Sequence, residues 1–113
     1  MASPAVDAAE DALKAAWDRV EATMNAAKKE TWHKALKRWH LIKGLEENAD
    51  RLLRYNGTEI AEAHHAALSK REKEAREKRD AAFKEAWESA PQNLRDAYER
   101  AMDALVEAYS HIP

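Results

Sequence analysis

The stretch WHLIKGLEENADRLLRYNGTEI, residues 39–60, decides the fold of this chain. Its apolar side chains recur every three or four positions, which is the period of an α-helix. They are Trp39, Ile42, Leu45, Ala49 and Leu52/Leu53. Asn56-Gly57 follows and is a strong turn signal. We therefore expect a helix that ends at this turn and a second helix that folds back along it.

The same apolar period can be followed back from this stretch to Ser3-Pro4, a typical helix start with proline in the first helical position. Gly44 interrupts the pattern but one glycine is weak evidence for a break. Thr58 can cap the second helix, and Ser89-Ala90-Pro91-Gln92 resembles a capping box that starts a third. The expected helices are 4–55, 58–89 and 91–111.

Composition agrees with an all-α protein. The 113 residues include only two glycines, three prolines and no cysteine, while Ala, Glu, Lys and Arg dominate. This length suits a single helical domain, residues 1–113. No apolar run is long enough to span a bilayer, and the first residues do not resemble a signal peptide, so we expect a cytoplasmic protein.

The expected packing is a long antiparallel helical hairpin plus a third helix, which together form a three-helix bundle with an extended first helix. The hairpin register sets Trp32 and Trp39 against the charged segment 71–80, which offers little apolar surface. The third helix can reverse and cover these tryptophans, which we favour, or continue along the first half of the first helix. Either route leaves an apolar stripe in water, which predicts a coiled-coil-like homodimer. Under the favoured route, its interface residues are Val6, Leu13, Trp17, Val20 and Met24.

Residues 28–43 carry six Lys/Arg and one Glu, although the whole chain has a formal net charge of −2. This basic segment has three interpretations: a core helix with a solvated face, a contact surface for an acidic protein, or a site for nucleic acid or an anionic membrane. Trp39 decides between a role in the core and a role in binding. The candidate partner-binding residues are Trp32, Leu36, Trp39, Lys34, Lys37 and Arg38.

The five histidines do not predict a metal site with any strength. No two of them have the three- or four-residue spacing at which one helix holds an ion. Glu30 with His33, and Glu62 with His65, are carboxylate–imidazole pairs, but the hairpin register separates the two pairs widely. We expect no metal and no other cofactor.

No nucleophile, base and oxyanion donor are predicted to converge, and no glycine-rich loop is present, so we expect no enzymatic activity. The sequence favours a protein–protein interaction or assembly factor, such as an adaptor, chaperone or small inhibitor, that acts through an apolar stripe of the first helix. Binding of nucleic acid or an anionic membrane through residues 28–43 is the alternative. A metal-binding helical bundle is a minor one.

Overall fold

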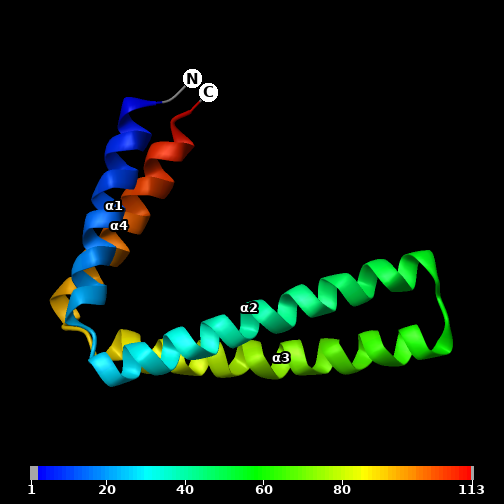
Figure 1. Ribbon diagram of the computed structural model, residues 1–113. Coiled ribbons are helices and arrows are strands. Elements are labelled where there is room, and N and C mark those ends of the chain that lie inside the picture. Colours follow the sequence, from blue (N-terminus) through cyan, green and yellow to red (C-terminus); the bar gives the residue numbers. More distant parts are fainter. Residues whose placement is uncertain (1–2, 113) are drawn as a thin grey trace. The chain divides into compact units, whose positions relative to one another are not determined.

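The computed structural model describes residues 3–112, and these residues form four α-helices and no strand. The helices are α1 (Pro4–Thr23), α2 (Ala26–Tyr55), α3 (Glu59–Glu88) and α4 (Gln92–Ser110). They divide into two compact units (Figure 1). One unit contains the chain up to Ala26 and from Glu85 onward, and the other contains residues 27–84. Within residues 3–112, no helix is both long and apolar enough to cross a membrane.

The expected helix 4–55 is in fact two helices, so the prediction of three helices is wrong. Met24 has an extended backbone, with φ −62° and ψ 148°, and the helical hydrogen bonds end there. The Thr23 hydroxyl donates to the carbonyls of Arg19 and Val20, both at 2.9 Å. The backbone N–H of Asn25 donates to Ser89 Oγ at 2.8 Å. The bond from Asn25 to Ser89 uses a backbone N–H that a continuous helix would have paired with a carbonyl four residues back, so it holds the chain out of the helix at this point.

In the first unit, α1 and α4 pack side by side and antiparallel (Figure 1). Val20 is completely buried, and Ala86 and Ala90 are buried in the same unit. Tyr98 lies between two tryptophans, with ring centroids 5.6 Å from Trp17 and 5.5 Å from Trp87. The favoured route of the last helix, back over the central tryptophans, is therefore not observed, because α4 is the partner of α1.

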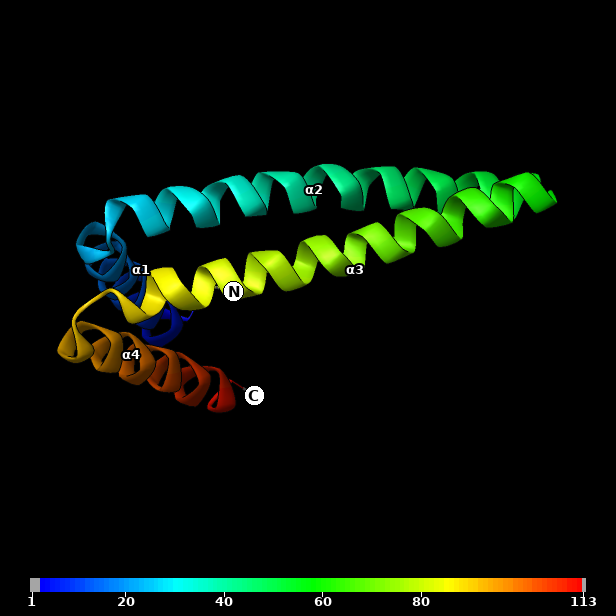
Figure 2. The same ribbon diagram turned by 90° about the horizontal axis from the view of Figure 1, so that it is seen from below.

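In the second unit, α2 and α3 lie side by side in both views (Figures 1 and 2). Their directions are opposite, because Asp50 contacts His65 near the turn while Trp32 contacts Phe83 at the far end. The turn follows Tyr55, and Thr58 Oγ1 accepts a hydrogen bond from the backbone N–H of Ala61 at 3.1 Å. This bond is the expected cap of α3.

Ser89 does not cap α4 as expected. The N-cap position of α4 is Pro91, and no side chain caps this helix. Ser89 Oγ instead donates to the carbonyl of Ala86 and accepts from Asn25. The serine therefore joins the end of α3 to the residue that follows α1, which stabilises the break in the expected long helix.

Candidate interaction surfaces

Trp39 lies on the face of α2 that packs against α3, and it is half-buried there. Its indole Nε1 donates a hydrogen bond to Glu72 Oε1 at 3.2 Å, and the Arg79 guanidinium lies 4.2 Å from the centre of its ring. Glu72 is only 6% exposed and also has Arg76 at 3.8 Å. A cation over an indole face and a charged acceptor for its N–H are both favourable contacts. The charged segment of α3 thus covers Trp39, which we had expected it to do poorly.

Trp32 and Leu36 are also half-buried on α2. The Trp32 ring lies 5.0 Å from Phe83 of α3 and 4.9 Å from His33, measured between centroids. The contact between Trp32 and Phe83 joins α2 to α3 at the end of the second unit that lies away from the turn. The aromatic members of the predicted partner-binding set are therefore engaged within the chain.

The basic members of that set have a different environment. Lys34, Lys37 and Arg38 are exposed, and Lys34 Nζ pairs with Glu30 at 3.1 Å. This pair is exposed and worth only a few tenths of a kcal/mol, about 0.3–0.5 for such helix pairs. The structure therefore separates the cations, which face solvent, from Trp39, which faces α3. It does not bring the six predicted residues together on one surface.

The predicted oligomer interface is largely covered by the chain itself. Val6, Val20 and Met24 are buried, and Leu13 and Trp17 are half-buried. The cover comes from the first unit, in which α4 packs along α1 and Tyr98 contacts Trp17. These residues do not form the free apolar stripe from which a dimer was inferred.

An exposed apolar row lies on α2, and sequence reasoning had assigned two of its members, Leu45 and Leu52, to the packing face of the helix. Leu41, Leu45, Leu52 and Tyr55 are 67%, 47%, 61% and 90% exposed. We call these four residues the α2 stripe. Their separations of four, seven and three positions place them along one face of the helix.

A second row in the same helix explains why the α2 stripe is left exposed. Its members alternate three and four positions apart, as helix contact residues do, and all are buried or half-buried: Trp39, Ile42, Glu46, Ala49 and Leu53. Since α3 covers this row, the α2 stripe on another face of the same helix is left in water. Two interleaved repeats in residues 39–55 were the signal that could have revealed it.

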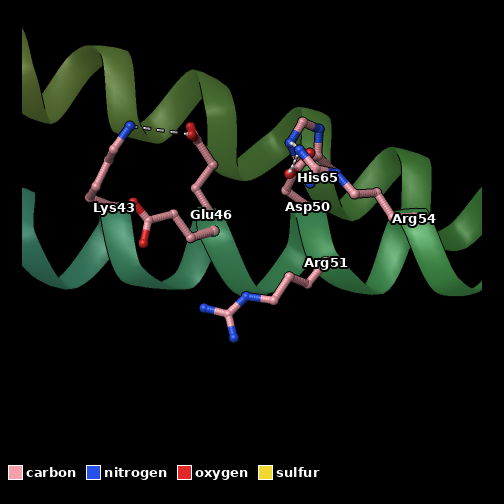
Figure 3. A pocket seen from close by; sticks show the side chains of 7 residues that line it. Lys43, Glu46, Asp50, Arg51, Arg54 and His65 are labelled. Atoms are coloured by element: carbon pink, nitrogen blue, oxygen red, sulfur yellow. Dashed lines mark ion pairs between the residues drawn. The ribbon is translucent and has the colours of Figure 1, made fainter.

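A polar depression also opens near the turn of the second unit (Figure 3). Asp50 is its centre, with Arg54 Nη2 at 2.9 Å and His65 Nε2 at 3.6 Å. Lys43 and Glu46 form a longer pair at 3.9 Å, and Arg51 points away from the other labelled side chains. Besides His65, the lining side chains are three basic and three acidic ones, so the depression offers no excess charge to attract an ion.

The histidines do not assemble a metal site. Within residues 3–112, no group of three or more His, Cys, Asp or Glu side chains is placed to hold an ion. His65, a member of one predicted carboxylate–imidazole pair, contacts Asp50 instead of forming part of a ligand set.

Tyr109 carries a clear electrostatic perturbation. Its hydroxyl donates to Glu10 Oε1 at 2.9 Å, across α1 and α4. This hydrogen bond, and then the negative charge of Glu10, raise the pKa of Tyr109 above its ordinary value of 10.0. Tyr109 is exposed, so the contact marks the edge of the α1–α4 packing and is not part of a pocket.

Comparison with known proteins supplies no further assignment. No family model, curated protein or solved structure matches the chain. The α2 stripe and the exposed side chains of Lys34, Lys37 and Arg38 are the surfaces on which a function can be proposed.

Proposed function

We propose that this chain is a non-enzymatic protein–protein interaction or assembly factor that acts through the α2 stripe. The observation that carries the proposal is the exposure of three leucines and a tyrosine along one face of one helix. Exposed apolar side chains that gather on one face are a common mark of an interaction site, whereas single ones need no explanation. An amphipathic helix face is also a common contact element between proteins.

The α2 stripe takes the place of the interface first expected on the N-terminal part of the chain. Both belong to the predicted helix 4–55, but α4 packs along α1. Val20 is completely buried, whereas Leu52 is 61% exposed. Burying a leucine side chain contributes about 1.5–3 kcal/mol, so the exposed leucines could supply much of the binding energy of a partner.

Affinity capture with the full chain tests the proposal. Leu52→Asp places a charge in the α2 stripe, and Val106→Asp is the matched control, because Val106 is 66% exposed on α4. Proteins retained by the wild type and by the Val106 variant should be lost with the Leu52 variant, and the helical circular dichroism of all three should agree. Equal retention by all three would contradict a role for the stripe.

A contact with nucleic acid or an anionic membrane through residues 28–43 is the second candidate, supported by the exposure of Lys37 and Arg38. Its aromatic component is weakened by the placement of Trp39 against α3. Phosphate contacts make affinity fall steeply with salt. Binding that is lost in Lys37→Glu/Arg38→Glu and at raised salt, but kept in Leu52→Asp, would favour this candidate over the first.

A further inference from the structure

We draw no further inference here: the strongest candidate, the exposed apolar face of α2 that the α2 stripe forms, is already the surface of the proposed function, and nothing in the structure shows what covers it.

Discussion

Replacing Trp39 by Phe tests the contact that joins the middle of α2 to α3. The indole N–H is a hydrogen-bond donor to Glu72, a carboxylate that is only 6% exposed. A phenyl ring keeps the stacking with Arg79 but removes the donor. Glu72 then stays buried but has lost the indole as a partner, and only Arg76 remains near it, at 3.8 Å.

The expected loss of stability can be assembled from two contributions. A hydrogen bond to a charged group contributes about 1.5–3 kcal/mol. The smaller ring loses about 20–40 Å² of contact, which adds about 0.5–1 kcal/mol at 25 cal/mol per Å². Trp39→Phe should therefore lower the free energy of unfolding by about 2–4 kcal/mol. Urea denaturation followed by circular dichroism measures this loss, and an unchanged slope shows that stability alone has changed.

A double-mutant cycle with Glu72→Leu separates the hydrogen bond from the loss of ring area. Without the carboxylate, Trp39→Phe should cost about 1 kcal/mol or less, so the coupling free energy should be at least about 1.5 kcal/mol. Glu72→Gln keeps an acceptor oxygen and should retain a smaller part of the coupling. A coupling free energy below about 0.5 kcal/mol would refute the structural role assigned to this pair.

Three further predictions concern the first unit. Val20→Ala should cost about 2–3 kcal/mol in a denaturation experiment, because Val20 is completely buried and the cavity would lie beneath the α1–α4 packing. Tyr109 should ionise above pH 10.0, and Glu10→Gln should move its pKa back toward this value in an ultraviolet absorbance titration. The raised pKa means that the stabilising contact is complete below pH 10.0 and is lost as the pH rises through the pKa of the folded state. Ser89→Ala should cost about 1 kcal/mol and speed hydrogen exchange at Asn25, whose N–H loses its acceptor.

The helical class and the turn after Tyr55 could be predicted from the sequence, because periodicity and composition act locally. The break at Met24 could not. The apolar period continues in phase across Thr23 and Asn25, so the pattern of one long helix and that of two shorter ones are the same. What distinguishes them is the hydrogen bond from Asn25 to Ser89, a residue 64 positions away. Such a contact is a property of the folded chain and leaves no local signal.

The environment of Trp39 was misjudged because charged side chains were treated as unable to cover an aromatic ring. Arg79 covers the ring with a planar guanidinium, and Glu72 accepts the indole N–H. Long charged side chains cover apolar surface with their stems and planar groups while their charged ends are paired or solvated. A charged segment opposite a tryptophan is therefore compatible with packing, and only its geometry shows whether packing occurs.

The break after α1 also changes where an interaction surface must be sought. With one continuous helix, the apolar residues near Val20 would extend beyond the hairpin and require a second subunit. With two helices, α4 packs along α1, and Val20 is completely buried. That argument for a dimer is lost, but α2 has more apolar surface than α3 alone covers, as the 61% exposure of Leu52 shows. The interaction surface that we propose therefore lies on a different helix and follows from a different physical cause.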